Sequence, residues 1–489
     1  MFNQSSQNQK VWIWRSLLVC LALFLFAIRL TGPTDMEGYA QHRNIGYVMD
    51  TVWEGNWLAH QDIQNRVMSK PPVHTWLAGL FSLVFGVDYF AMALPSFLAL
   101  LALALLVFEI GRRRLDTMAA GFAGLAFLLA PLTAKHIALI RTDALFTLTI
   151  ALVAWAALRK WERGSTWTLF WAFAAIATMV KGPVGLILGA AGLLAYFWER
   201  RTDPNTPRLT GGGHLKGLAL FFGIAGGWFI AAWLAWGPDL LDKMLFDELF
   251  GQATGARKDS FPGENLPKPT LYFLGRFLPF SLFTFYGLWR VCRRPESDPA
   301  KRRFERFLFC WIGGGLLMFS LAAHHRPDLL LPLWTAGALL AGREMARLAK
   351  RIGPQRMTIG TAVIASILVA TTFWNYHQLT PKRAEIAQFG IEARQAAEAF
   401  ATTGLNPHTL YHLDTPVTFQ LYLKTFRTWS SPGEISQLIE SGEPLLVAVT
   451  EASNYSELFE AEMPEEVFRW PPAGEPKREP TIRVMKFNP

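Results

Sequence analysis

Apolar segments long enough to cross a lipid bilayer recur through the first 375 residues of this 489-residue chain. A helix needs about 20 apolar residues to span the hydrocarbon layer. Hydrophobic residues make up 51% of the sequence and charged residues only 17%. Because the hydrocarbon layer holds no water to satisfy an open backbone, such segments have to be helices. We therefore expect a polytopic α-helical membrane protein.

Clusters of Lys and Arg between the apolar segments orient the chain, since such clusters concentrate on the cytoplasmic side. Placing every cluster there, among them 112–114 and 343–351, gives one consistent solution with eleven spans. The predicted spans are 11–31, 90–111, 115–131, 144–158, 167–180, 183–198, 216–236, 270–289, 304–323, 328–342 and 357–375. The N-terminus is then cytoplasmic and the C-terminal segment extracytoplasmic. The net charge of +9 follows from these loops and does not indicate nucleic-acid binding.

The first outer loop, residues 32–89, contains two stretches with apolar residues at helical spacing, near 45–53 and 73–85. We expect amphipathic helices that lie in the membrane interface. A short tilted span at 73–86 would reverse every later loop and place the Arg clusters outside, so it is not favoured.

The composition changes after about residue 376. "TPKRAEIAQFGIEARQAAEAF" predicts a helix, "TLYHLD" and "PLLVAVT" predict strands, and Ser431 with Glu434 predicts a capping box. We expect a transmembrane domain over residues 1–376 and a small soluble α/β domain over residues 377–489, on the outer side.

Polar residues collect in the predicted outer loops, where the positive-inside rule leaves few cations. The candidates are Asp35, Glu37, Lys70, Arg141, Asp143, Lys181, Arg257 and Arg326. Each also has a structural reading, such as solvated acids at a helix end, a snorkelling Lys70 or an Arg141–Asp143 ion pair. His324 and His325 lack a third ligand at helical spacing, so no metal site is assigned, although a divalent metal is left open.

Carboxylates and cations at one water–lipid boundary suit a lipid-linked phosphosugar. Its phosphate lies at the level of the headgroups and its polyprenyl tail lies in the hydrocarbon. Cations stabilise the charge that develops on a departing phosphate, and a carboxylate can take the proton of an attacking hydroxyl. These residues therefore favour inverting transfer of a sugar at the membrane surface.

The ordered motifs "DMEGYA", "RVMSKPPVHTWL", "IRTDALF", "VKGPVG" and "HHRPDLLLPLW" resemble those of the aminoarabinose transferase-like membrane glycosyltransferases, which are related to protein mannosyltransferases. The resemblance covers roughly residues 11–345. It implies the C-type glycosyltransferase fold and a polyprenyl-phosphate sugar donor, such as one carried on undecaprenyl phosphate. It also implies an extracytoplasmic acceptor, which is lipid A, another glycan or protein, and a location in the plasma (inner) membrane.

The resemblance implies Asp35 as the catalytic carboxylate, Lys70 in the lipid-phosphate site and Asp143 as a supporting acid. We include Glu37 with the catalytic carboxylates, and Arg141, Lys181, Arg257 and Arg326 with the donor phosphate. The chain departs from the family pattern at Met36 and Gly38, where an acid and a base are usual, and at Ser69, where aminoarabinose transferases often have an acid. These departures weaken the case for aminoarabinose and lipid A, and for a metal near Lys70.

Two other functions are weighed against this one. A transporter or flippase of a lipid-linked or anionic substrate would place ionisable residues inside its spans and show pseudo-symmetric halves, and neither pattern is present. A non-catalytic scaffold would be indifferent to changes at the outer-loop acids and cations.

Overall fold

The computed structural model describes residues 2–38, 40–254, 261, 263–378, 380–450, 455, 464–476 and 478–488. The chain forms two compact units, which are described separately. The first unit comprises Met1–Thr31, Ser69–His74 and Ala93–Trp374. The second unit comprises Gly32–Met68, Thr75–Met92 and Asn375–Pro489. The domain division at residue 376 stays a prediction.

The first unit is helical. Its elements are α1 (Phe2–Thr31), α4 (Tyr89–Arg114), α5 (Thr117–Leu129), α6 (Pro131–His136), α7 (Asp143–Arg163), α8 (Thr168–Lys181), α9 (Val184–Ala190), η1 (Ala191–Leu194), α10 (Ala195–Thr202), α11 (His214–Phe221), η2 (Phe222–Gly226), α12 (Gly227–Trp236), α13 (Pro238–Leu241), η3 (Asp242–Phe250), α14 (Gly251–Thr254), α15 (Lys268–Arg276), α16 (Phe280–Arg293), α17 (Pro299–Leu321), η4 (Pro327–Leu330), α18 (Leu333–Ile352) and α19 (Pro354–His377). Helices cover the greater part of all eleven predicted segments.

Six helical stretches of the described chain are long and apolar enough to cross a bilayer: Gln7–Thr31, Tyr89–Arg114, Asp143–Arg163, His214–Trp236, Pro299–Leu321 and Pro354–His377. The shorter apolar helices include α3 (Val73–Phe85), α5 and α8. Eleven crossings therefore remain a prediction.

Helix starts and close helix contacts follow from local sequence. Asp116 caps α5 by accepting a hydrogen bond from the backbone N of Ala119 at 2.8 Å. Asp298 caps α17 in the same way, with Pro299 in the first turn. A Cβ added at Gly124 would lie 2.7 Å from a Leu18 methyl carbon, so only glycine allows α1 to approach α5 this closely.

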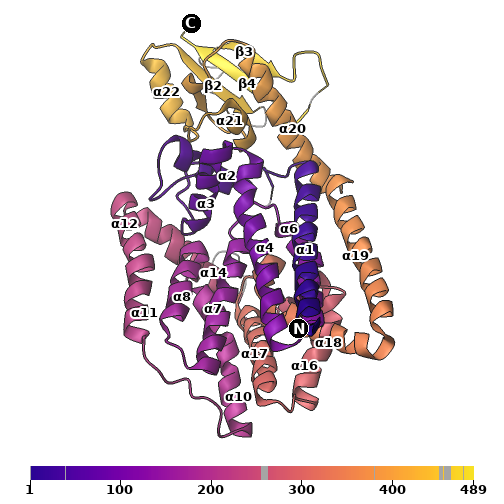
Figure 1. Ribbon diagram of the computed structural model, residues 1–489. Helices are drawn as coiled ribbons and strands as arrows, with labels where there is room; N and C mark the ends of the chain where they lie inside the picture. The colour runs from indigo at the N-terminus through magenta and orange to yellow at the C-terminus, as the bar shows by residue number, and fades with distance from the viewer. Residues whose placement is uncertain are drawn as a thin grey trace. The chain divides into compact units, whose positions relative to one another are not determined.

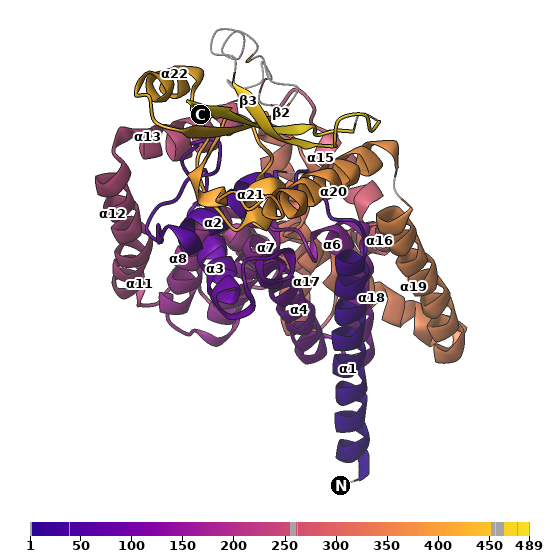
Figure 2. The ribbon, with the colours of Figure 1, turned by 90° about the horizontal axis from the view of Figure 1, so that it is seen from above.

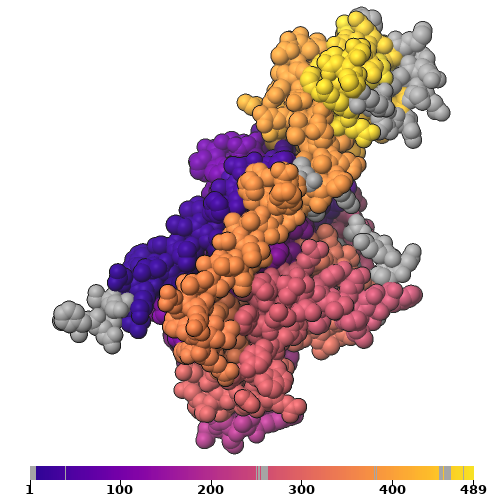
Figure 3. Space-filling view, turned by 90° about the vertical axis from the view of Figure 1, so that its right-hand side faces the viewer, coloured from indigo at the N-terminus to yellow at the C-terminus, as the bar shows by residue number. Residues whose placement is uncertain are grey.

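Two helical segments lie at opposite margins of the first unit, α19 on one side and α11–α12 on the other (Figures 1 and 2). In the most apolar stretch of each of these two segments, only 17% is buried. Figure 3 shows α19, in orange, lying open along one face. Apolar helices exposed in this way suit contact with lipid, because acyl chains can cover them.

The second unit contains α2 (Gln41–Trp53), most of α3, and the C-terminal segment. That segment has α20 (Pro381–Ala401), η5 (Pro407–Thr409), β1 (Leu410–His412), α21 (Val417–Leu423), α22 (Pro432–Glu440), β2 (Leu445–Thr450), β3 (Glu465–Trp470) and β4 (Ile482–Phe487). The strand order is β1-β2-β4-β3, with β1 and β2 parallel and the other pairs antiparallel.

The sheet is covered on both faces because adjacent residues of β2 point to opposite sides. Ala448 packs with Phe400 of α20 and Phe419 of α21. Val447 packs with Ile435 of α22 on the other face. The predicted helix at 380–400 is present as α20, and so is the capping box that starts α22.

The predicted helices of the first outer loop are also present, as α2 and α3. Asp50 of α2 organises the chain that follows it, since its carboxylate accepts hydrogen bonds from the Asn56 side chain at 2.7 Å and the Gln61 backbone N at 2.8 Å. Burial raises the pKa of Asp50 to about 6, against the effect of those bonds. On α3, Leu83 and Val84 are exposed, which suits an interfacial helix.

Candidate functional site

A carboxylate–cation cluster in the first unit begins at Asp143, the first residue of α7. Its Oδ1 accepts from the Lys181 ammonium at 2.5 Å, and its Oδ2 lies 3.1 Å from the Arg141 guanidinium. Lys181 is the last residue of α8, so its charge lies at the negative end of that helix. Three of the residues predicted from the outer loops are thus in direct contact.

Gly182 lets the chain turn sharply after Lys181. Its φ of 100° and ψ of 178° belong to a backbone region that essentially only glycine occupies. The next helix, α9, then packs closely on α7 and α8. A Cβ at Gly185 would lie 2.9 Å from both Phe146 and Ala177.

Asp328, in η4, is a second anionic centre of the first unit and is 6% exposed. Its carboxylate lies 3.0 Å from the Lys135 ammonium, 3.0 Å from Nε2 of His136 and 3.4 Å from Arg141. Arg326 lies 3.7 Å away at the open side. Arg141 therefore contacts both Asp143 and Asp328.

Lys70 pairs with Glu248 of η3, with 2.8 Å between ammonium and carboxylate. Burial lowers the pKa of Lys70, and the attraction of Glu248 opposes this effect. Lys181 lowers the same pKa and Asp143 raises it, so the Lys70 pair and the Asp143 pair act on each other electrostatically.

His136 is buried, and burial lowers its pKa although Asp328 opposes the change. The cluster holds five cations, Lys70, Lys135, Arg141, Lys181 and Arg326, against three carboxylates, Asp143, Glu248 and Asp328. Two positive charges are left over among these residues, enough to attract a phosphate.

A cavity of about 480 Å³ opens beside the cluster. Its polar lining includes Lys70, Asp143, Lys181, Glu248, His324 and Asp328. The rest is largely apolar, with Phe221, Phe222, Trp228 and Phe229 from α11–α12 and Met318 and Phe319 from α17. Helices α7, α8 and α11 lie side by side (Figure 1), and each contributes residues to the cavity lining. Charge at one part and aromatic walls at another suit an amphiphilic ligand with an anionic head.

The remaining predicted residues are placed differently. Asp35 and Glu37 belong to the second unit. There Asp35 Oδ1 accepts from the Gln41 side chain at 2.7 Å, and Glu37 contacts Thr418. Arg257 lies outside the described residues. Among the residues described, no group of three or more His, Cys, Asp or Glu is arranged to hold a metal ion.

A second cavity, of about 260 Å³, lies between the predicted cytoplasmic ends of the helices. Its charged residues are mostly paired, as in Arg343 with Glu305 at 2.5 Å and Arg347 with Glu296. Nearby, Glu199 accepts from Arg306 at 2.7 Å.

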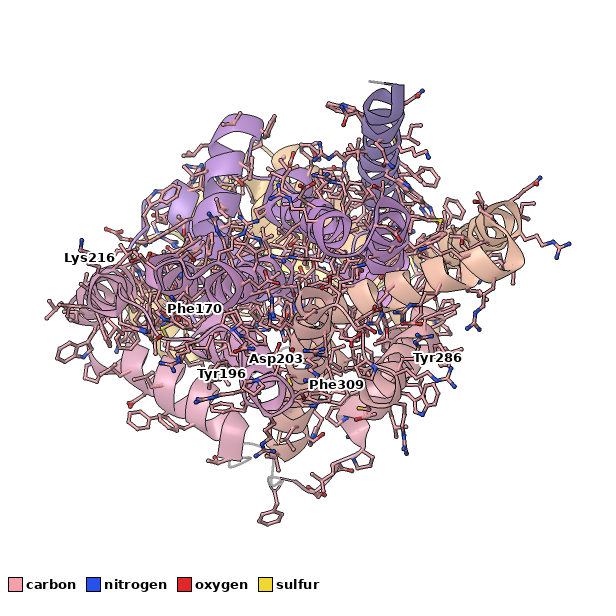
Figure 4. The ribbon with its side chains drawn as sticks, turned by 60° about the horizontal axis from the view of Figure 1, so that its bottom comes forward. Phe170, Tyr196, Asp203, Lys216, Tyr286 and Phe309 are labelled. Carbon is pink, nitrogen blue, oxygen red and sulfur yellow. The ribbon has the colours of Figure 1, made fainter. Side chains whose placement is uncertain are left out.

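Figure 4 looks at this end of the helices, where α10 contacts α17 and Asp203 lies 3.5 Å from Arg302. Since these charges satisfy one another, the network fixes the helix ends.

Lys135, His136, Glu248 and Asp328 were missed as site residues by the sequence analysis. Asp328 stands inside the quoted motif "HHRPDLLLPLW", and an acid directly after Arg-Pro in an outer loop was the available signal. Glu248 carried no such signal, because its contact with Lys70 joins residues 178 positions apart.

Comparison with known proteins gives three kinds of likeness. Residues 69–224 match the family described as dolichyl-phosphate-mannose-protein mannosyltransferase. An uncharacterized protein of Aquifex aeolicus is 24% identical over 285 residues, which cover 56% of this chain and 52% of that protein. The undecaprenyl phosphate-alpha-4-amino-4-deoxy-L-arabinose arabinosyl transferase of Pseudomonas savastanoi pv. phaseolicola is 26% identical over 353 residues, or 67% of this chain and 60% of that protein.

The chain thus spans about half the length of the first of these relatives and 60% of the second. Among solved structures, ArnT from Cupriavidus metallidurans bound to undecaprenyl phosphate aligns over 97% of this chain and 98% of its own, with 18% identity and a TM-score of 0.75. That likeness confirms the predicted fold class, a polytopic helical membrane protein, while the span count stays a prediction.

Proposed function

Because the chain is related to the aminoarabinose transferase-type membrane glycosyltransferases and shares their fold, we propose that it transfers a sugar from a polyprenyl phosphate to an extracytoplasmic acceptor. The acceptor is a lipid such as lipid A, a glycan or a protein. The enzyme works at the outer surface of the plasma (inner) membrane. The cavity of the first unit, charged in one part and aromatic in another, carries this proposal.

The cations bind the carrier phosphate. Lys70 and Lys181 line the cavity, and Arg141 contacts both Asp143 and Asp328 behind it. Phosphate oxygens accept charge-assisted hydrogen bonds from such groups more strongly than neutral acceptors do. When the sugar leaves, the charge that grows on the phosphate is stabilised by cations already in position. Asp143 supports catalysis by holding Lys181 and Arg141.

The apolar walls bind the start of the polyprenyl chain. Phe222 is 63% exposed and lies on η2, between α11 and α12. The most apolar stretch of the segment His214–Trp236, which these three elements form, is only 17% buried. A wall open to lipid lets an isoprenoid tail remain in the hydrocarbon while its phosphate reaches Lys70. ArnT from Cupriavidus metallidurans, with the same fold, was solved bound to undecaprenyl phosphate, and we extend that class of carrier to this chain.

Asp35 acts as the general base in this proposal. A carboxylate can accept the proton of an attacking hydroxyl when it lies within hydrogen-bond reach. A phosphate leaving group needs little protonation, so one carboxylate with a set of cations suffices. Two-carboxylate hydrolases are built differently.

Mass spectrometry of lipid A, surface glycans and exported proteins from cells with and without the gene tests the proposal. Deletion should remove one sugar mass from one of these fractions. Wild-type protein should restore it, and Asp35→Asn should not. Asp88→Asn is the matched control, because Asp88 is a carboxylate of the same loop that caps α4 through Ala91, and asparagine caps equally well. Unchanged spectra after deletion, or full restoration by Asp35→Asn, would contradict the proposal.

A further inference from the structure

We propose that Glu37 and Thr418 are positioning residues, through which the C-terminal segment holds the turn that carries Asp35. This inference rests on the proposed function, in which Asp35 is the base. It assigns Glu37 a role different from direct catalysis, and it gives the C-terminal segment a part in the reaction. All the contacts involved lie within the second unit.

The first step is the contact itself. Glu37 Oε1 accepts hydrogen bonds from the Thr418 backbone N at 2.8 Å and from the Thr418 hydroxyl at 2.6 Å. Thr418 is fully buried near the start of α21. Because both bonds reach one oxygen, they hold the Glu37 carboxylate at the start of α21.

The second step connects Glu37 to Asp35. The backbone N of Gly38 donates to the carbonyl O of Asp35 at 2.8 Å, which closes a turn over residues 35–38. The side chain of Gln41, a buried residue of α2, donates to the same carbonyl at 2.9 Å and to Asp35 Oδ1 at 2.7 Å. Glu37 lies inside this turn, so its anchored side chain constrains the short segment that carries Asp35.

The third step is a second point of support. A Cβ added at Gly38 would lie 3.1 Å from Cγ2 of Ile386, a residue of α20. The first outer loop meets the C-terminal segment at a second place, where the Trp429 backbone N donates to the Ile63 carbonyl at 2.6 Å. Two helices of that segment, α20 and α21, therefore contact the Asp35 turn directly.

The fourth step concerns energy. Burial raises the pKa of Glu37, although both hydrogen bonds from Thr418 act in the opposite direction. Burying a carboxylate costs free energy of desolvation, and an apolar side chain at the same position would avoid that cost. We infer that its value lies in geometry, since the two directed bonds specify one conformation of the turn.

Turnover of radiolabelled undecaprenyl phosphate-aminoarabinose and of dolichyl phosphate mannose, by the full-length protein in cell membranes, tests the inference. Glu37→Ala should lower kcat about tenfold and leave the KM for the donor within about twofold. Glu37→Gln keeps an acceptor oxygen and should retain most of kcat. Thr418→Ser should resemble the wild type, whereas Thr418→Val should lose activity.

Asp414→Ala is the matched control. Asp414 also accepts from the backbone N and hydroxyl of one threonine, Thr450, at 2.8 and 2.5 Å, and burial raises its pKa as well. The Asp414→Ala variant should lower thermal stability as much as Glu37→Ala does and leave kcat nearly unchanged. Equal loss of kcat in both variants, or no rescue by Glu37→Gln, would overturn the inference. If Asp35→Asn is fully active on a donor that the wild type turns over, the proposed function fails and the inference falls with it.

Discussion

Asp328 is the residue on which most contacts of the charged cluster depend. Its carboxylate meets Lys135, His136 and Arg141 within 3.4 Å, while only 6% of the residue is exposed. Removing one member of a buried charge group leaves the others unpaired, which costs far more than losing an exposed ion pair.

Asp328→Asn should therefore lower the free energy of unfolding by on the order of 3 kcal/mol. The measurement is thermal unfolding of purified protein in detergent, followed by intrinsic fluorescence. Glu398→Gln is the control, because the Glu398–Arg394 pair on α20 is half exposed and is worth roughly 0.5 kcal/mol. Equal stability of the two variants would show that Asp328 does not hold the cluster together.

Single residues were predictable where a local pattern marked them. A cation retained in an outer loop beside Gly and Pro pointed to Lys181, and "IRTDALF" pointed to Arg141 and Asp143; the structure brings these three into contact. Their role in phosphate binding stays a prediction. Glu248 could not be found in this way, since its partner Lys70 lies 178 positions away and one sequence does not reveal such a pair. Asp328 stands in a quoted motif, but its contacts with Lys135, His136 and Arg141 join residues 187 to 193 positions apart.

At the scale of elements, the junction of α8 and α9 determines where Lys181 lies. Gly182 has φ of 100° and ψ of 178°, and among the described residues other than its chain neighbours none has an atom within 4 Å of an added Cβ. A side chain there would cause backbone strain alone, without a steric clash. Holding a residue other than glycine in this region costs about 1–3 kcal/mol.

Gly182→Ala should therefore shift Lys181 and reduce sugar transfer severalfold, with a modest loss of stability. Gly390→Ala is the matched control: Gly390 lies inside α20 with ordinary helical backbone, and an added Cβ would meet no atom of the described residues beyond its own helix within 4 Å. Alanine favours a helix by about 1 kcal/mol there, so that variant should keep full activity and gain stability. Transfer by Gly182→Ala at the wild-type rate would count against a positional role for this turn.

Elements were the most predictable level of this chain. Apolar runs and Lys/Arg clusters located helices over all eleven segments, and Ser431 with Glu434 located the start of α22. The π-helical segment η3 was not anticipated, since π-helices are rare and appear mostly as single turns inside α-helices. Glu248, the partner of Lys70, lies on that segment.

At the scale of the whole molecule, the charge distribution predicts orientation. Eleven crossings place the two ends of the chain on opposite sides, with the N-terminus cytoplasmic. Alkaline phosphatase fused after residue 489 should therefore be active, and green fluorescent protein at the same place should stay dark. A fluorescent fusion would mean an even number of crossings, and the proposed outer loops would have to be reassigned.

The carrier-phosphate site is tested most directly by the affinity of the purified protein for undecaprenyl phosphate. Wild-type protein should bind it, and Lys70→Ala and Lys181→Ala should each weaken binding about tenfold, or about 1.4 kcal/mol. Lys350→Ala, at the second cavity, is the control and should bind as the wild type does. Unchanged affinity in both Lys70→Ala and Lys181→Ala would contradict the assignment of this cavity to the lipid carrier.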